Sequence, residues 1–201
     1  MAHSIYLSPS EMDLIKERDA GVSHCPNSNI SIRSGLFKVH DLMDKGVKVG
    51  LGTDVAGGNN FSILNAIRYA ISVANVNSFV EKESERQLLT TAQGLKKKLR
   101  LRLLIFCVFD LNFNSKLSFS SIAFYLATVG GAKVVGLEDK IGSLEVGKEF
   151  DALLIDCQVP NSPFDVFESD TLETKFNKFI FLGDDRNITK IYVQGKLVHS
   201  L

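Results

Sequence analysis

Apolar residues recur at helical spacing in three segments of the first half of the chain. The first segment, 8–20, opens with Ser-Pro-Ser-Glu, which supplies a capping serine, a proline suited to the first turn and a glutamate that completes a capping box. Gly21 is expected to end this helix. Two more helices are predicted from the sets Leu36, Val39, Leu42, Met43 (ended by Gly46) and Leu64, Ile67, Ile71, Ala74.

Short apolar runs separate these helices. Residues 22–25 and 47–51 predict strands; Pro-Asn-Ser-Asn at 26–29 is expected to break the first into a loop, and a glycine-containing loop at 56–58 follows the second. Helices and strands therefore alternate, which is typical of βα units with parallel strands. The sequence predicts an α/β fold.

Polar residues stand where the predicted strands end. His24 ends the first strand and Asp54 follows the second, while His3 precedes the first helix at a place where another strand would end. In α/β sheets and barrels, chemistry gathers at the carboxyl ends of the strands. These three side chains are the candidate site residues.

Residues 82–116 do not fit the alternation. A basic run at 96–102 precedes an apolar run at 103–109, which is far shorter than the roughly 20 residues that a membrane helix needs. An artefact of translation across an exon boundary is the preferred interpretation. A solvated insertion and a basic amphipathic membrane anchor are the alternatives. The helical pattern resumes at 122–127 and leads into Gly130 and Gly131.

The character of the chain changes near residue 137. A Gly-bounded turn at 141–148 and a strand at 151–156 precede a terminal hairpin at 191–198. The expected domains are therefore a βα region at 1–136 and a small β-rich module at 137–201.

Composition narrows the functional classes. Hydrophobic residues make up 45% of the 201 positions, enough for a packed core, and 23 basic residues balance 23 acidic ones. This balance gives no reason to expect a nucleic acid or membrane partner. The three cysteines lack CxxC spacing, and no signal peptide opens the chain, so a cytoplasmic location is expected.

Three ordered motifs carry a resemblance to a known family. His-Cys-Pro-Asn-Ser-Asn at 24–29, Val-Gly-Leu-Gly-Thr-Asp at 49–54 and the segment 141–151 resemble, in that order, the deaminase and chlorohydrolase branch of the amidohydrolase superfamily. Segments 23–35, 50–58 and 182–188 are similar to the guanine deaminase family within it. The likeness extends over residues 2–80 and 118–198.

The resemblance implies a distorted (β/α)8 barrel with a small β-sandwich, a zinc cofactor and a homodimer. This chain would supply the last three βα units and the trailing sandwich strands, because a complete barrel usually needs about 250 residues. The other zinc ligands and a proton-shuttling glutamate would lie upstream. The chain alone is therefore expected to be an inactive fragment.

The resemblance also assigns roles to the candidate residues. Asp54 would bind the metal and accept a proton from its water, since zinc lowers the pKa of bound water to about 7. His3 would face that water and the substrate, where an imidazole stabilises developing charge. For His24, substrate contact and a structural role both stay open. The side chains at 27–29 are expected to be scaffolding.

The reaction implied is hydrolysis of guanine to xanthine and ammonia. Another purine, pterin or triazine aminohydrolase is the alternative within enzymes. A non-catalytic scaffold protein on the same fold is the alternative outside them.

Overall fold

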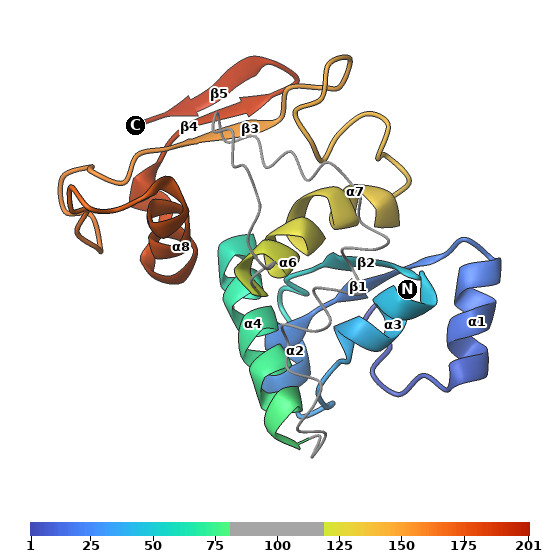
Figure 1. Cartoon of the computed structure of the whole chain (residues 1–201). Helices are drawn as coiled ribbons and strands as arrows, with labels where there is room; N and C mark the ends of the chain where they lie inside the picture. The colour runs from blue at the N-terminus through green and yellow to red at the C-terminus, as the bar shows by residue number, and fades with distance from the viewer. Residues whose placement is uncertain (81–118) are drawn as a thin grey trace. The chain divides into compact units, whose positions relative to one another are not determined.

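The computed structural model describes residues 1–80 and 119–201. Two compact units divide these residues, the first holding 1–80 and 119–138 and the second 139–201 (Figure 1). Residues 82–116, with their three interpretations, lie outside the described part. None of the helices in the described part is both long and apolar enough to span a membrane.

The first unit is built on parallel extended segments. Strands β1 (Gly21–His24) and β2 (Lys48–Leu51) pair in parallel, with Val22 opposite Val49 (Figure 1). The amino-terminal residues run along the other edge of β1, where Ala2 forms a parallel bridge with Ser23. The Ser23 N–H donates to the Met1 carbonyl at 2.8 Å, and the His3 N–H donates to the Ser23 carbonyl at 3.0 Å. The predicted parallel pairing is confirmed.

Residues 1–80 also contain helices α1 (Pro9–Glu17), α2 (Pro26–Ser31), α3 (Val39–Lys45) and α4 (Ile63–Val80). The capping box of α1 is present, and Gly46 ends α3 in the left-handed conformation with φ of 81°. Both features were predicted from the sequence.

Two sequence predictions about this region are wrong. The first helix ends at Glu17, and Gly21 begins β1 instead of ending the helix. Residues 26–29 form part of helix α2 and not a loop. Proline lacks an N–H, but the first helical position leaves that group without an intrahelical partner, so Pro26 can begin a helix directly after a strand.

A compact apolar cluster fills the space between the strands and helices of this unit. Its members come from α1, α3, both strands and their flanking residues, and from the helical segment near residue 126: Ile15, Val22, Phe37, Val39, Leu42, Val47, Val49 and Leu126. Burial of each such side chain contributes about 1.5–3 kcal/mol. This cluster holds the strands in place beneath their carboxyl ends.

Glycines allow the backbone of β2 to approach a helix very closely. Helix α6 (Phe119–Tyr125) continues through a π-helical turn, Leu126–Gly130, into α7 (Gly131–Val134), so helical structure runs on past both glycines. A Cβ on Gly130 would lie 2.5 Å from the Val49 carbonyl oxygen, and one on Gly50 would lie 2.9 Å from the Gly131 Cα. These positions therefore accept no side chain without movement of backbone.

The second unit contains an antiparallel sheet in the order β3 (Ala152–Ile155), β4 (Ile188–Val193), β5 (Lys196–Ser200). Gln194 and Gly195, with φ of 50° and 75°, form the hairpin turn that the sequence predicted. Helix α8 (Leu172–Leu182) was not predicted; Thr171 caps its first turn by accepting from the Thr174 N–H.

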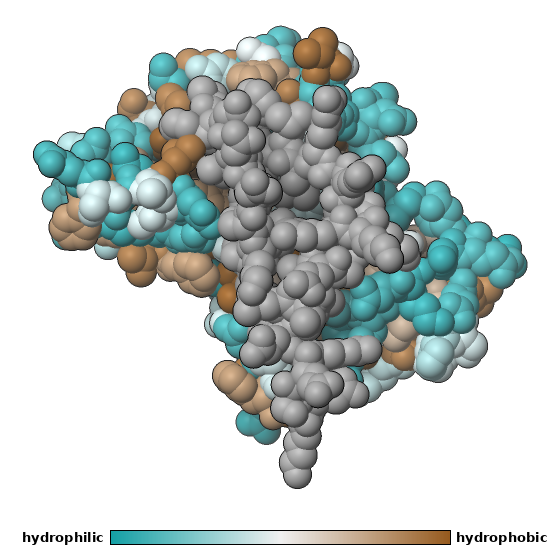
Figure 2. All heavy atoms as spheres, viewed as in Figure 1, coloured by the Kyte–Doolittle hydropathy of each residue, from teal (hydrophilic) through white to brown (hydrophobic). Residues whose placement is uncertain are grey.

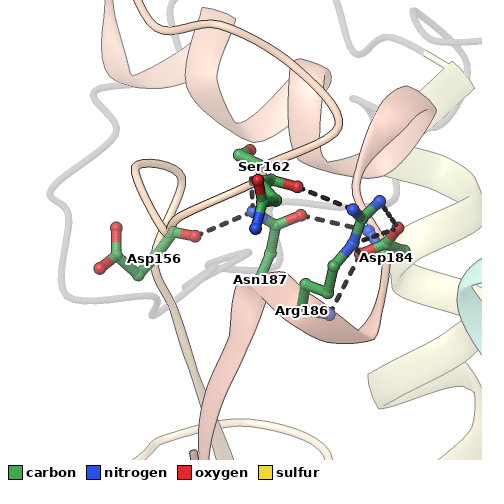
Figure 3. Close-up of polar contacts among 6 residues, drawn as sticks. Asp156, Ser162, Asp184, Arg186 and Asn187 are labelled. Carbon is green, nitrogen blue, oxygen red and sulfur yellow. Dashed lines mark hydrogen bonds and ion pairs between the residues drawn. The ribbon is translucent and has the colours of Figure 1, made fainter.

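A polar cluster ties the end of β3 to the start of β4 (Figure 3). The buried Asn187 donates from Nδ2 to the Asp156 carbonyl at 3.0 Å and to Ser162 Oγ at 3.3 Å. Arg186 donates to Asp184 Oδ2 at 2.6 Å. The motif at 182–188 thus bonds to the segment that follows β3 and has a structural role between the two strands.

Surface chemistry differs between the elements. Hydrophilic residues dominate the right of the view in Figure 2, where α1 lies, although Leu14 of this helix is exposed. By contrast, the sheet of the second unit has no buried residue, and several of its apolar side chains are exposed: Leu153, Leu154, Val193, Leu197 and Val198.

We expect Gly50→Ala to destabilise the chain by about 1–3 kcal/mol, because the added methyl group would press on the backbone of Gly131. Gly131→Ala is the matched control, since its Cβ would meet only the Leu126 carbonyl oxygen at an ordinary 3.5 Å. Urea unfolding of both variants measures the difference. Equal free energies of unfolding would show that the close approach does not constrain β2.

Candidate active site

His3 and Asp54 come together at the carboxyl ends of the parallel segments. His3 follows the bridge between Ala2 and β1, and Asp54 lies three residues beyond β2. Their side chains approach with His3 Nε2 3.6 Å from Asp54 Oδ2, and about a third of each is exposed (36% and 37%). An imidazole and a carboxylate therefore lie side by side at the strand ends, where both are accessible to solvent.

Both residues hold a rare backbone conformation. The φ angle is 61° at His3 and 51° at Asp54, in the left-handed region. Asp and His enter this region more readily than most residues, yet the conformation still costs about 1–2 kcal/mol. Such strain collects at functional sites, where the surrounding structure holds it. The same conformation occurs elsewhere in the described part of the chain, at Ser4, Asp19, Arg33, Asn161 and Gln194, so it does not by itself distinguish the candidate pair.

Helix α2 supports the site with three consecutive side chains. Ser28 Oγ donates to Asp54 Oδ2 at 2.6 Å, and Asn29 Oδ1 accepts from His3 Nδ1 at 2.8 Å. Asn27 Nδ2 donates to Asn59 Oδ1 at 2.7 Å, which holds the loop after β2. The sequence identified residues 27–29 as scaffolding, but their individual partners required the tertiary structure.

Glycines bring the loop after β2 close to the carboxylate. A Cβ on Gly57 would lie 2.6 Å from Asp54 Oδ2 and 3.1 Å from Ser28 Oγ. One on Gly58 would lie 2.2 Å from the Thr53 carbonyl oxygen. The sequence predicted a flexible loop here. The physical reason for Gly57 is the lack of room beside the Asp54 carboxylate, and for Gly58 it is the closeness of the Thr53 carbonyl.

His24 is placed differently from the other two candidates. It is completely buried, and its ring stacks on Phe37 with 4.7 Å between centroids. Neither ring nitrogen has a hydrogen-bond partner in the described part of the chain, and desolvation lowers the pKa of His24 to about 3. The imidazole is therefore neutral at physiological pH. Its contact with substrate stays a prediction, and its burial favours the structural alternative.

Cys25 adds no nucleophile to this site. It is 4% exposed, and burial raises the pKa of its thiol, with the charge of Asp54 acting in the same direction. Since the thiolate is the reactive form, the raised pKa keeps this cysteine unreactive.

The described residues do not complete a zinc site. Asp54 and His3 are both of ligand type, but zinc takes three or four protein ligands, and residues 1–80 and 119–201 hold no group of three or more His, Cys, Asp or Glu that could bind a metal. Within the described residues, these two side chains are therefore fewer than the ligands that zinc takes.

Comparison with known proteins places these residues in a family. The model of the Amidohydrolase family matches residues 1–198. The chain belongs to the amidohydrolase family. Its α/β architecture and its paired His3 and Asp54 are therefore to be understood within a family of hydrolases.

Several relatives within the amidohydrolase family are guanine deaminases. The chain is 43% identical to the guanine deaminase of Mus musculus over 202 residues, which cover 98% of this chain and 38% of that protein. It superimposes on the guanine deaminase of C. acetobutylicum, solved with guanine in its active site, with a TM-score of 0.70 and 32% identity over 99% of this chain and 38% of that one. The chain thus spans well under half the length of these relatives.

A more distant structure shares the fold. An adenosine deaminase from Xanthomonas campestris, solved with bound zinc, matches 98% of this chain and 36% of its own length with a TM-score of 0.66 and 24% identity. At this identity the likeness concerns the amidohydrolase fold alone.

The burial of His24 predicts a pH-dependent stability. Its folded pKa of about 3 lies below the ordinary 6.5, so between these values the unfolded chain binds a proton that the folded chain does not. The free energy of unfolding should fall by about 1.4 kcal/mol per pH unit on this account as the pH drops below about 6.5.

Urea unfolding at several pH values between about 7 and 4.5 tests this expectation. His24→Phe, which keeps an aromatic ring against Phe37, should show a shallower loss of stability on acidification than the wild type. His199→Phe, at an exposed histidine, should leave the slope unchanged. Equal slopes in all three proteins would contradict the buried neutral state of His24.

Proposed function

We propose that this chain is part of a zinc-dependent guanine deaminase, which hydrolyses guanine to xanthine and ammonia, with His3 and Asp54 in its active site. The observation that carries the proposal is the 3.6 Å approach of these side chains at the strand ends. It occurs in a chain that is 43% identical to the mouse guanine deaminase. The role of the whole protein rests on this relationship, because the chain covers 38% of that relative.

Asp54 is proposed as a zinc ligand and as a proton acceptor. Its Oδ2 already accepts from Ser28 at 2.6 Å, whereas Oδ1 has no hydrogen bond within the described residues. Ser28 thereby orients the carboxylate and leaves Oδ1 available. Zinc, when bound, supplies the Lewis acidity that makes a water molecule nucleophilic near neutral pH.

His3 is proposed to face the attacking water and the substrate. Its Nε2 lies on the side of Asp54, and its Nδ1 is held by Asn29 at 2.8 Å, so the ring has a defined direction. An imidazole held beside the reacting carbon can exchange a proton there and stabilise the charge that develops. Water adds to the carbon that bears the amino group, and ammonia leaves with the proton transferred to it.

The architecture of the complete protein is part of the same proposal. Residues 1–136 form the last three βα units of a distorted (β/α)8 barrel, and 137–201 form strands of a small β-sandwich. The three parallel segments that end near His3, His24 and Asp54 support the first assignment. The antiparallel sheet β3-β4-β5 supports the second. Dimer formation and a cytoplasmic location remain expectations from the resemblance.

One observation favours the second candidate, a non-catalytic protein on the amidohydrolase fold. The part of the chain that the structure describes contains only two converging ligand-type side chains, His3 and Asp54, and no group of three. This feature also agrees with a partial active site. Restoring the rest of the barrel separates the two cases.

For the 201-residue chain alone we expect much less than one zinc per chain and no ammonia release from guanine, because too few ligands converge. Metal analysis and an ammonia assay measure both. In a chimera where this chain replaces the matching segment of the mouse guanine deaminase, guanine hydrolysis should appear. A chimera with a full zinc complement and no activity would support the non-catalytic alternative.

In that chimera Asp54→Ala should reduce turnover by several orders of magnitude, because a metal ligand and a proton acceptor are lost together. His3→Ala should lower turnover more than zinc content. Asp13→Ala, which removes an exposed partner of Lys45, is the matched control and should change neither. A tenth of wild-type turnover in Asp54→Ala, or zinc lost in proportion to activity in His3→Ala, would make the assigned roles wrong.

A further inference from the structure

The segment that follows Asp54 is a short loop closed on itself. Residues 55–58 are Val, Ala, Gly and Gly, and Asn59 follows them. The Gly58 N–H donates to the Asp54 carbonyl at 2.6 Å, which brings the two ends of the segment together. Gly58 is buried, whereas the three residues before it and Asn59 after it are exposed. The loop 55–59 therefore presents a defined surface to solvent beside Asp54.

This loop packs directly against the candidate pair of side chains. A Cβ on Gly57 would lie 2.6 Å from Asp54 Oδ2, so the backbone of the loop touches the carboxylate. The first side chains of the loop, Val55 and Ala56, carry neither a charge nor a hydrogen-bonding group, and Val55 is 58% exposed. A small apolar surface next to a few polar groups is typical of a site for a flat, uncharged ring.

One buried amide holds the far end of the loop. Asn27 of α2 is 2% exposed, and its Nδ2 donates to Asn59 Oδ1 at 2.7 Å and to Asn65 Oδ1 at 3.3 Å. Its Oδ1 accepts from Ser31 Oγ at 3.1 Å and from the Asn59 N–H at 3.5 Å. A backbone N–H can only donate, so the contact with Asn59 fixes which end of the Asn27 amide is the oxygen. Asn27 thus joins α2, the loop and the first turn of α4.

The near end of the loop is held by different contacts. Ser28 Oγ donates to Asp54 Oδ2 at 2.6 Å, and the Gly52 N–H donates at 2.8 Å to the carbonyl that ends β1. These bonds place Asp54 without the help of Asn59. Loss of the contact between Asn27 and Asn59 should therefore release the far part of the loop and leave the carboxylate in place.

We propose that Asn27 is a positioning residue that fixes the loop 55–59 as one wall of the substrate site, against which the face of the guanine ring packs. The identity of the ring rests on the proposed function, whereas the hold of Asn27 on the loop does not. A released loop occupies its binding arrangement only part of the time, and the apparent affinity for a ligand falls by that fraction. The chemistry of the bound substrate is unchanged, so Asn27 acts on KM and not on kcat.

Amide hydrogen exchange of the full 201-residue chain tests the hold on the loop. Asn59→Ala removes the loop partner of Asn27 at an exposed position. It should speed exchange of the Gly58 N–H by about two- to tenfold, the usual effect of one hydrogen bond. Asn65→Ala is the matched control, because it removes the other amide partner of Asn27 and keeps the contact with Asn59. Exchange at Gly58 should not change in this control.

Kinetics of the chimera with the mouse guanine deaminase test the wall. Asn59→Ala should raise KM for guanine by about two- to tenfold, with kcat and zinc content unchanged. Asn65→Ala should change none of the three. The double variant Asn27→Ala with Asn59→Ala should raise KM no further than Asn27→Ala alone, because both changes remove the same contact.

Unchanged exchange at Gly58 in Asn59→Ala would overturn the positioning role of Asn27, even if Asn27→Ala fails to fold. Faster exchange with an unchanged KM in an active chimera would overturn the wall. A fall in kcat and zinc content at unchanged KM would overturn it too, since the loop would then act through Asp54. Faster exchange in a chain whose zinc-loaded chimera does not deaminate guanine would contradict the proposed function and leave the hold of Asn27 on the loop standing.

Discussion

The parallel pairing of residues 1–3, β1 and β2 is the constraint on which the candidate site depends. Parallel strands carry their carboxyl ends to one edge, so residues more than 50 positions apart in the sequence, His3 and Asp54, meet within 3.6 Å. A shift of one residue in this register would turn Val22 and Val49 away from the core. The packing of the buried cluster therefore fixes the register of the two strands, and with it the positions of the residues at their ends.

Helix α2 converts this coarse placement into defined side-chain directions. Its polar residues are buried, which would cost stability if they had no partners. Ser28, Asn29 and Asn27 instead bond to Asp54, His3 and Asn59. Because a buried hydrogen bond is costly to break, the helix can hold two strained residues in the left-handed conformation. The hydrogen bonds of α2 that orient the site residues are thus the same ones that satisfy its buried polar side chains.

The amidohydrolase family accounts for the α/β fold in which His3 and Asp54 lie side by side at the strand ends. The two ligand-type side chains that converge in the described residues are fewer than zinc needs, and the chain spans 38% of the mouse relative. His24 also lies at a strand end, but its environment differs from that of His3 and Asp54. Its ring is buried against Phe37 and is neutral, so position at a strand end does not by itself make a residue catalytic.

Local pattern in the sequence determined the alternation of helices and strands, the capping box at Ser8 and Glu11 and the hairpin turn at Gly195. These features depend on residues close together in the chain, as does the grouping of His3, His24 and Asp54 as strand-end residues. Only the tertiary structure distinguished His3 and Asp54, which are partly exposed, from the buried His24. It also showed that residues 26–31 form a helix and that neighbouring atoms leave no room for a side chain at Gly50 and Gly57. Burial, backbone approach and the partner of a side chain depend on segments distant in sequence, and a pattern of neighbouring residues does not contain them.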